Sequence, residues 1–279
     1  KIKYPPMGLM KIATYYRQCG DDVRFFKGNL KLFAAELLFE EFYEIIKSEK
    51  PQWQKYFDEF SKFIKVGRTY YTDDIPDFQG SKYEELLTSY RMRYKSKDYP
   101  KFDIICVTTL FTFYWAKTID AINEVKNFLK SEGKIYVGGI AATILPEKIF
   151  EETGIYPHVG LLDKPNDLDK NDDVIIDELP LDYSILEEVD FEYPASDAYF
   201  GYMTRGCIRN CSFCAVPRLE PKYKNYVSIK NQIKYTDSKF GEKRTLLLMD
   251  NNVFASNKFD KIIDEIKEWG FAKGMTYNP

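Results

Sequence analysis

The chain has 279 residues, 44% of them hydrophobic, which is enough to bury one large core or two smaller ones, and its length favours two domains. The net charge of -3 argues against a protein that holds nucleic acid or anionic membranes through overall positive charge. No uncharged apolar run reaches the roughly 18 residues of a membrane span, and the first ten residues lack the apolar core of a signal peptide. We therefore expect a cytoplasmic protein without membrane contact.

The N-terminal third of the chain is predicted to be mostly helical. A helix is expected within residues 4–20, where two prolines precede an apolar stripe and a glycine follows it, and a short strand is expected at residues 22–28. Residues 29–93 then carry helical periodicity, including a pattern that resembles a capping box beginning at Ser81. We interpret residues 29–93 as a helical insertion whose many aromatic residues form a core, with a ligand surface as the alternative.

Strands and helices alternate in the rest of the N-terminal half. Buried strands are predicted at residues 103–109, 134–139 and 158–162. Helices are predicted between them at residues 116–131 and 141–154. Such alternation implies right-handed crossovers and a parallel sheet with ligand space at the carboxyl ends of its strands. We therefore predict a Rossmann-like α/β domain over residues 1–162, interrupted by the helical insertion.

A second domain is predicted to follow an acidic, proline-containing linker at residues 163–182. This second domain covers residues 183–279. Its expected elements are a strand at 197–204, a loop with three cysteines, a helix at 227–241, a strand at 245–250 and a helix at 259–270. The order is that of the first units of a parallel β/α fold, and it places the cysteines at the carboxyl end of the first strand.

Three of the five cysteines, Cys207, Cys211 and Cys214, lie in this one loop. Five cysteines in a chain of this length are too few and too unevenly spaced for a disulfide framework, so the cluster indicates metal or redox chemistry. Cys19 and Cys106 stand apart, and we interpret them as ordinary inert thiols.

Three thiols suit an iron-sulfur cluster better than a zinc ion. Structural zinc normally has four protein ligands, and the only histidine, His158, belongs to the other predicted domain. A four-iron cluster held by three thiolates leaves one iron open for a small molecule. Gly206 and Asn210 tolerate the irregular backbone that converging thiolates need. Residues 205–224 contain five basic residues and one acidic residue, a net charge of +4 that would offset the charge of a cluster; an ordinary solvated basic surface is the alternative.

The pattern Cys207-x3-Cys211-x2-Cys214, with the aromatic Phe213 just before the third cysteine, resembles the signature loop of the radical S-adenosylmethionine (SAM) enzymes. The resemblance implies that the three cysteines ligate a [4Fe-4S] cluster and that SAM binds the fourth iron through its amino and carboxylate groups. It implies that electron transfer from the cluster cleaves SAM to methionine and a 5'-deoxyadenosyl radical. It further implies a partial (β/α) barrel, an adenine contact at Phe213, and a reductant such as flavodoxin or ferredoxin.

The polar residues that end the strand predicted at 245–250 resemble another element of this family, a segment that helps to hold the SAM amino group. Asp250 and Asn252 are the candidates for this contact. The alternative is that the Asp-Asn-Asn run only makes a turn and a helix cap.

Parts of the N-terminal half resemble the cobalamin-binding domains that precede radical SAM domains in one subgroup. The similar segments are residues 4–26, 106–125 and 136–147. Four residues are expected at strand ends facing such a ligand: Thr108, Thr109, Gly138 and Gly139. The Asp-x-His-x-x-Gly loop that supplies a cobalt ligand is missing from the sequence, so a structural domain without cobalamin is the alternative.

Both ends of the chain look cut when compared with this family, because the usual strand before Tyr4 and most of the barrel after Cys214 are missing. The leading hypothesis is a radical SAM enzyme acting on an unassigned substrate, with or without methyl transfer through cobalamin. A tRNA methylthiotransferase-like enzyme is an alternative, because CSFCAVPRLEP resembles the Cys-x-Val-Pro continuation of that group. A non-catalytic iron-sulfur or zinc-binding module is another. Catalytic residues other than the cluster ligands are not assigned.

Overall fold

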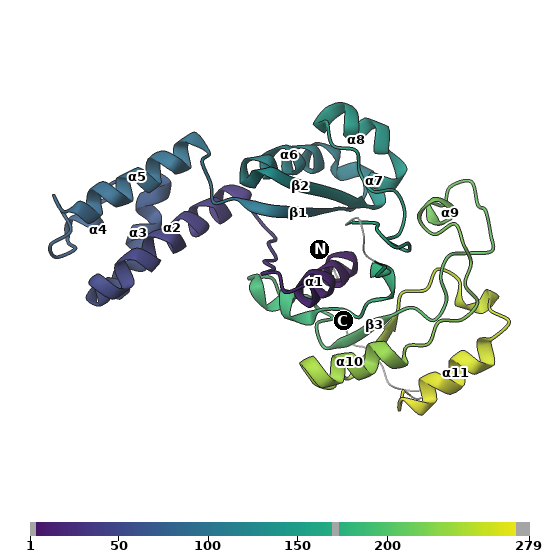
Figure 1. Cartoon of the computed structure of the whole chain (residues 1–279). Helices are drawn as coiled ribbons and strands as arrows, with labels where there is room; N and C mark the ends of the chain where they lie inside the picture. Colours follow the sequence, from purple (N-terminus) through teal and green to yellow (C-terminus); the bar gives the residue numbers. More distant parts are fainter. Residues whose placement is uncertain (1–3, 169–172, 272–279) are drawn as a thin grey trace. The chain divides into compact units, whose positions relative to one another are not determined.

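The computed structural model describes residues 4–168 and 173–271 (Figure 1). Contacts divide the chain into two compact units. The first, called the cysteine unit, comprises Lys1–Lys27, Cys106–Trp115 and Tyr136–Pro279, and the second, called the helical unit, comprises Gly28–Ile105 and Ala116–Ile135. In the described part of the chain the strands form two small sheets, β1 with β2 and β3 with β4. The protein is therefore of mixed α/β class, as the alternation of elements predicts.

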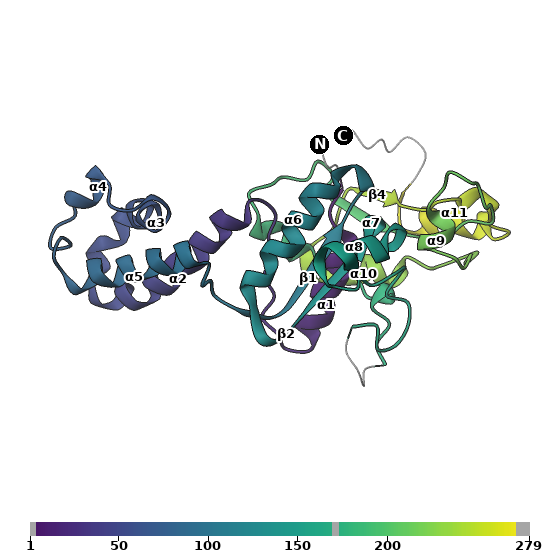
Figure 2. The same cartoon turned by 90° about the horizontal axis from the view of Figure 1, so that it is seen from above.

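The helical unit is formed mainly by the residues predicted as a helical insertion. Its elements are α2 (Leu30–Glu49), the 3-10 helix η1 (Pro51–Tyr56), α3 (Phe57–Val66), α4 (Tyr70–Asp73) and α5 (Lys82–Ser96). Helices α2, α3 and α5 pack against one another (Figure 2). Four aromatic side chains in their core are at most 1% exposed: Phe42, Trp53, Phe60 and Phe78. The prediction that the aromatic residues of this segment form a core is thus confirmed.

Side-chain caps fix where the two longest of these helices begin. The Asn29 side chain accepts a backbone hydrogen bond at the start of α2. At the start of α5, Ser81 Oγ accepts hydrogen bonds from Tyr83 N and Glu84 N, each at 3.3 Å. The Glu84 carboxylate accepts from Gly80 N at 2.7 Å, one residue before the position that a complete capping box uses. The predicted helix start at Ser81 is therefore confirmed.

The first sheet and its helices differ from the prediction in their bounds. Strand β1 (Phe102–Thr109) lies where expected, whereas α6 (Trp115–Val125) ends earlier than residue 131 and β2 (Leu129–Gly139) begins earlier than residue 134. The single helix predicted at 141–154 is two helices, α7 (Ile140–Ile144) and α8 (Pro146–Thr153). Pro146 causes the break, because it cannot continue a helix and instead occupies the first turn of α8.

Two of the predicted strands are wrong, since residues 22–28 and 158–162 belong to neither sheet of the described chain. His158 N does donate to Val137 O in β2 at 2.8 Å, but the ladder that defines a strand is not continued. In residues 22–28, Phe25 N donates to the Glu188 carboxylate at 2.5 Å. A side chain thus accepts the hydrogen bond of a backbone N-H that was expected to pair with a neighbouring strand.

In the cysteine unit, α1 (Met7–Gln18) packs against residues 176–188, which include the end of the predicted linker. This segment contains the 3-10 helices η4 (Ile176–Glu178) and η5 (Tyr183–Glu188). Thr14 Oγ1 donates to Pro180 O at 2.8 Å, and Asp182 N donates to Met10 O at 3.3 Å. Apolar residues of both segments share one buried cluster with β3: Met10, Ala13, Leu181, Ile185, Ala198 and Phe200. This part of the predicted linker is thus packed on α1.

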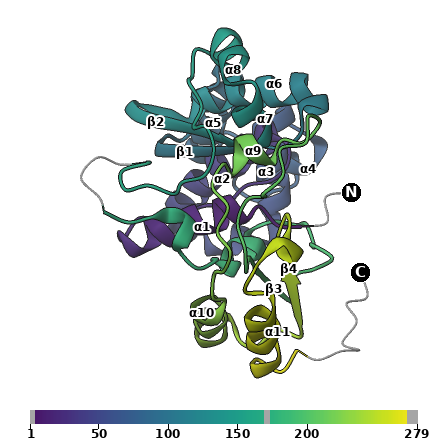
Figure 3. The ribbon, with the colours of Figure 1, turned by 90° about the vertical axis from the view of Figure 1, so that its right-hand side faces the viewer.

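The second sheet pairs β3 (Ala198–Gly201) with β4 (Thr245–Leu248) in parallel, with Ala198 opposite Thr245 and Gly201 opposite Leu248. Helix α10 (Lys230–Phe240) precedes β4, and α11 (Phe259–Glu268) follows it (Figure 3). Buried residues in or next to both helices and β3 share one cluster: Tyr199, Met203, Ile229, Ile233 and Ile262. The predicted order of strand, cysteine loop, helix, strand and helix is confirmed. Because the strands are parallel, their carboxyl ends lie together.

Candidate functional site

The cysteine loop, defined as residues 206–223, lies between β3 and α10 and is closed at its base. Arg205 N donates to Lys224 O at 3.2 Å, and Lys224 N donates to Arg205 O at 2.9 Å, which makes an antiparallel bridge between the residues that flank the loop. Near its end the loop contains one helical turn, α9 (Val216–Leu219), with Pro217 in the first turn. The cysteines lie between the closed base and this turn.

Gly206, the first residue of the cysteine loop, occupies a position that only glycine fits. Its φ angle is +70°, in the left-handed region. A Cβ atom there would lie 2.7 Å from Lys222 O and 2.8 Å from Glu220 O. Gly206 N donates to the Glu220 carboxylate at 2.6 Å. The first residue of the loop is therefore in close contact with residues near the end of the loop.

The three cysteines differ in their surroundings. Cys207 and Cys211 are half-buried and Cys214 is exposed, and all three are free thiols. Cys207 Sγ accepts hydrogen bonds from Arg209 N and from Asn252 Nδ2, each at 3.4 Å. The bond from Arg209 N, and after it the bond from Asn252, lowers the pKa of the Cys207 thiol because both stabilise the thiolate. A lowered pKa favours the thiolate of Cys207, which is the form that ligates metals.

The described residues include no group of three or more Cys, His, Asp or Glu side chains arranged to hold a metal ion. Cys211 and Cys214 are joined by a turn in which Cys214 N donates to Cys211 O at 3.0 Å. The donor set still fits an iron-sulfur cluster, because three thiols lie on one irregular loop of positive charge and one of them already faces N-H donors. Binding would require the three thiols to converge.

Two exposed apolar side chains accompany the cysteines. Ile208 is 63% exposed and Phe213 is 92% exposed. The adenine contact expected of the Phe213 backbone stays a prediction, and the Phe213 ring lies outside the core. Large apolar side chains exposed to this degree contribute little to folding.

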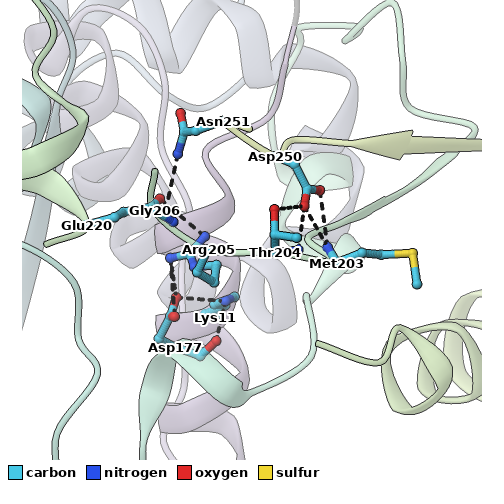
Figure 4. Close-up of polar contacts among 9 residues, drawn as sticks. All are labelled: Lys11, Asp177, Met203, Thr204, Arg205, Gly206, Glu220, Asp250 and Asn251. Carbon is cyan, nitrogen blue, oxygen red and sulfur yellow. Dashed lines mark hydrogen bonds and ion pairs between the residues drawn. The ribbon is translucent and has the colours of Figure 1, made fainter. Parts of the chain in front are cut away.

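Asp250 lies just after β4 and binds the chain just after β3. Its carboxylate accepts from Met203 N at 3.1 Å, from Thr204 Oγ1 at 2.5 Å and from Thr204 N (Figure 4). Both partners are completely buried. These contacts give Asp250 a structural task that needs no cofactor, and its predicted contact with SAM stays a prediction.

The two asparagines after Asp250 both reach the cysteine loop. Asn252 Nδ2 is the donor to Cys207 Sγ described above, and Asn251 Nδ2 donates to the Glu220 carboxylate at 3.2 Å. Asn252 is predicted to contact SAM, and in the structure its side chain contacts the first cysteine. The carboxyl end of β4 and the cysteine loop thus form one site.

A buried group of charges, which sequence analysis missed, lies under the base of the cysteine loop (Figure 4). Asp177 Oδ1 lies 3.0 Å from Lys11 Nζ and 3.1 Å from Arg205 Nη2. Arg205 Nη1 lies 3.4 Å from Glu220 Oε1, and its guanidinium lies 4.0 Å from the centre of the Tyr202 ring. The four charged side chains are 7% to 14% exposed. We call Lys11, Asp177, Arg205 and Glu220 the ion chain.

Burial changes the titration of this group. Burial lowers the pKa of Lys11, and the attraction of Asp177 does not compensate fully. Burial also opposes the charge of Arg205, but Asp177 and Glu220 together outweigh it, so the pKa of the guanidinium is raised. Burial raises the pKa of Tyr202. All four charges of the ion chain have opposite charges as neighbours, which is how buried ions are normally tolerated.

The four residues predicted to face cobalamin lie together at the ends of β1 and β2. Thr109 Oγ1 donates to Gly138 O at 2.9 Å and accepts from Ala142 N at 2.9 Å, so Thr109 helps to start α7. Gly139 has a φ of +100°, and a Cβ atom there would lie 2.3 Å from Thr109 O and 3.2 Å from Thr108 Oγ1. The close backbone approach at Gly139 is thus made by β1 itself, whereas a Cβ on Gly138 would meet nothing within 4 Å. Cobalamin binding stays a prediction.

Comparison of the chain with protein-family models, with curated proteins and with solved structures finds no match. Among the described residues, no helix has both the length and the apolar character required to cross a bilayer.

Proposed function

We propose that this chain carries the cluster-binding core of a radical SAM enzyme. The observation that supports the proposal most is the position of the three-cysteine loop: it follows β3 directly, is closed at its base, and receives Asn252 from the end of the parallel strand β4 at the first cysteine. Sites of parallel β/α folds lie at the carboxyl ends of strands, and this loop begins at such an end.

In this proposal Cys207, Cys211 and Cys214 hold three irons of a [4Fe-4S] cluster. When bound and reduced, such a cluster supplies one electron for the cleavage of SAM at its open iron. The chain's own residues stabilise the first thiolate through Arg209 N and Asn252, and the segment that carries the thiols has a net positive charge. The backbone at Phe213, whose side chain is 92% exposed, contacts the adenine of SAM in this proposal. The proposal includes a partial barrel around β3 and β4, a cytoplasmic location and a flavodoxin- or ferredoxin-like reductant.

The cluster proposal is tested by anaerobic reconstitution with iron and sulfide, followed by dithionite and SAM. We expect release of methionine and 5'-deoxyadenosine, with loss of both products in Cys207→Ala, Cys211→Ala and Cys214→Ala. Cys19→Ala is the matched control, because Cys19 is exposed and lies outside the loop. Products formed equally by the three loop variants, or no products from wild-type protein with a complete cluster, would contradict the proposal.

Cobalamin binding at β1 and β2 is the second part of the proposal. Gly138 leaves open space at the strand end, and Arg218 Nη1 in α9 donates to Ile144 O in α7 at 3.4 Å, so the end of the cysteine loop reaches the helix that follows this glycine. A spectrophotometric titration with hydroxocobalamin tests this part. Saturable binding that is weakened by Gly138→Val supports it, and absence of binding leaves β1 and β2 with a structural role.

A further inference from the structure

We propose that Arg205, Asp177 and Lys11 act as a positioning device, which keeps the base of the cysteine loop closed and fixes it to α1 through the segment that contains η4. The loop-closing part of this inference stands on the geometry alone. Its consequence for an iron-sulfur cluster rests on the function proposed above.

Arg205 contacts both ends of the loop. Its backbone N and O pair with Lys224, the residue that follows the loop. Its side chain faces Glu220, near the loop's end, and Gly206 N donates to the same carboxylate. Arg205 therefore holds the beginning and the end of the loop together, two residues before Cys207.

Asp177 connects Arg205 to the body of the cysteine unit. Both of its carboxylate oxygens accept from Arg205 Nη2, at 3.1 and 3.2 Å, and Oδ1 also accepts from Lys11 Nζ at 3.0 Å. Lys11 belongs to α1, and Asp177 belongs to η4. A single carboxylate thus bridges a helix near the start of the chain and the base of the loop.

The two apolar clusters described for the cysteine unit contain no residue of the loop. These two clusters lie around α1, β3, α10 and α11, and the large apolar side chains of Ile208 and Phe213 in the loop are exposed. Loss of the Asp177 charge would leave the buried cations Lys11 and Arg205 with Glu220 as the one remaining carboxylate of the ion chain, which is strongly unfavourable. The loop base is expected to open while the packed clusters remain, because opening returns Arg205 to water.

Limited trypsin digestion of the full chain without metal tests the loop-closing part, because Arg209 and Arg218 provide cleavage sites inside the loop. We expect Asp177→Asn to be cut there at least about tenfold faster than wild type, with its thermal transition still cooperative. Glu178→Gln is the matched control, since Glu178 is the next residue, is 64% exposed and contacts Lys224 only at 3.9 Å. Equal cleavage of Asp177→Asn and Glu178→Gln overturns the inference.

Arg205→Lys provides a second variant that keeps the charge but loses the planar fork. We expect intermediate loop cleavage, and if Asp177→Asn does not fold, this variant decides: faster cleavage with unchanged melting supports the inference, and cleavage at the wild-type rate overturns it. On reconstituted protein, we expect iron to be released to a chelator fastest from Asp177→Asn, more slowly from Arg205→Lys and slowest from wild type. The electron paramagnetic resonance spectrum of the reduced cluster should differ from that of wild type in the same order of variants. If wild-type protein binds no iron, the proposed function fails while the digestion result still stands.

Discussion

The core of the helical unit is buried and the ion chain at the base of the cysteine loop is largely buried, but different forces hold these two regions. Aromatic rings fill the first, with Trp53 against Phe60, Phe78 and Tyr83 at centroid distances of 5.1 to 5.8 Å. The ion chain and hydrogen bonds to Gly206 and Cys207 hold the second. Apolar packing spreads stability over many contacts, whereas the loop depends on a few directional ones. We therefore expect large losses of stability from the core and specific losses of loop structure from the base.

The largest effect is expected for Trp53→Ala in the helical unit. The side chain is 1% exposed and its Nε1 donates to Pro76 O at 3.1 Å, so truncation leaves a cavity and an unpaired carbonyl. We expect a loss of about 3–5 kcal/mol in the free energy of unfolding, measured in urea. Val66→Ala, at a position that is 66% exposed, is the control. A loss below about 1 kcal/mol for Trp53→Ala would show that the aromatic core does not stabilise this unit.

Gly206→Ala is expected to have the next largest effect. The new Cβ would clash with Lys222 O and Glu220 O, in addition to the cost of a positive φ, so we expect a loss of about 1–3 kcal/mol and faster digestion of the loop. Gly241→Ala is a matched control, because Gly241 also has a positive φ, +75°, but a Cβ there would meet nothing within 4 Å. If both variants lose the same stability and their loops are digested at the same rate, the contact between the start and the end of the loop does not cause the effect of Gly206→Ala.

Asn252→Ala should change reactivity more than stability. Asn252 helps to lower the pKa of Cys207, so its removal should raise that pKa and reduce the thiolate fraction at neutral pH. The rate at which iodoacetamide alkylates Cys207, measured by mass spectrometry at a series of pH values, should rise at a higher pH than in wild type. Asn251→Ala is the control, because Asn251 contacts Glu220 and not the thiol. An unchanged pH profile for Asn252→Ala would remove Asn252 from the site.

The smallest effect is expected for Glu44→Gln, which removes an ion pair with Lys47 on the surface of α2. The two side chains are 63% and 47% exposed, so solvent screens their attraction. We expect the free energy of unfolding to change by less than about 0.5 kcal/mol. A larger change would mean that surface charge contributes to this unit in a way that the packing of its core does not explain.

The same contrast explains what could be predicted from sequence. The helices of the insertion follow from apolar periodicity and from caps such as Ser81, and the parallel strands around the cysteine loop follow from short apolar runs. Strands expected at residues 22–28 and 158–162 were wrong because strand pairing depends on distant partners that a local pattern does not contain. The ion chain was missed for the same reason, since 166 residues separate Lys11 from Asp177.

For the candidate site, the spacing of residues in the sequence identifies the three cysteines but not the groups that position them. Gly206 was expected to allow an irregular backbone, and the structure gives the specific reason, the contact with the loop's own end. Asn252 was expected near SAM, and it contacts Cys207. Thr109 was expected to face a ligand, and its hydroxyl is used by α7 and β2. Residue type and spacing thus predicted where polar groups lie better than they predicted which groups these residues contact.

Binding of a four-iron cluster by the cysteine loop is the proposal on which the function of this chain depends. The most direct measurement is the iron, sulfide and zinc content per chain after anaerobic reconstitution, made on wild type and on Cys211→Ala. We expect about four irons and four sulfides in wild type, little zinc, and a large loss of iron in the variant. One zinc per chain without iron and sulfide, or equal iron in both proteins, would contradict it.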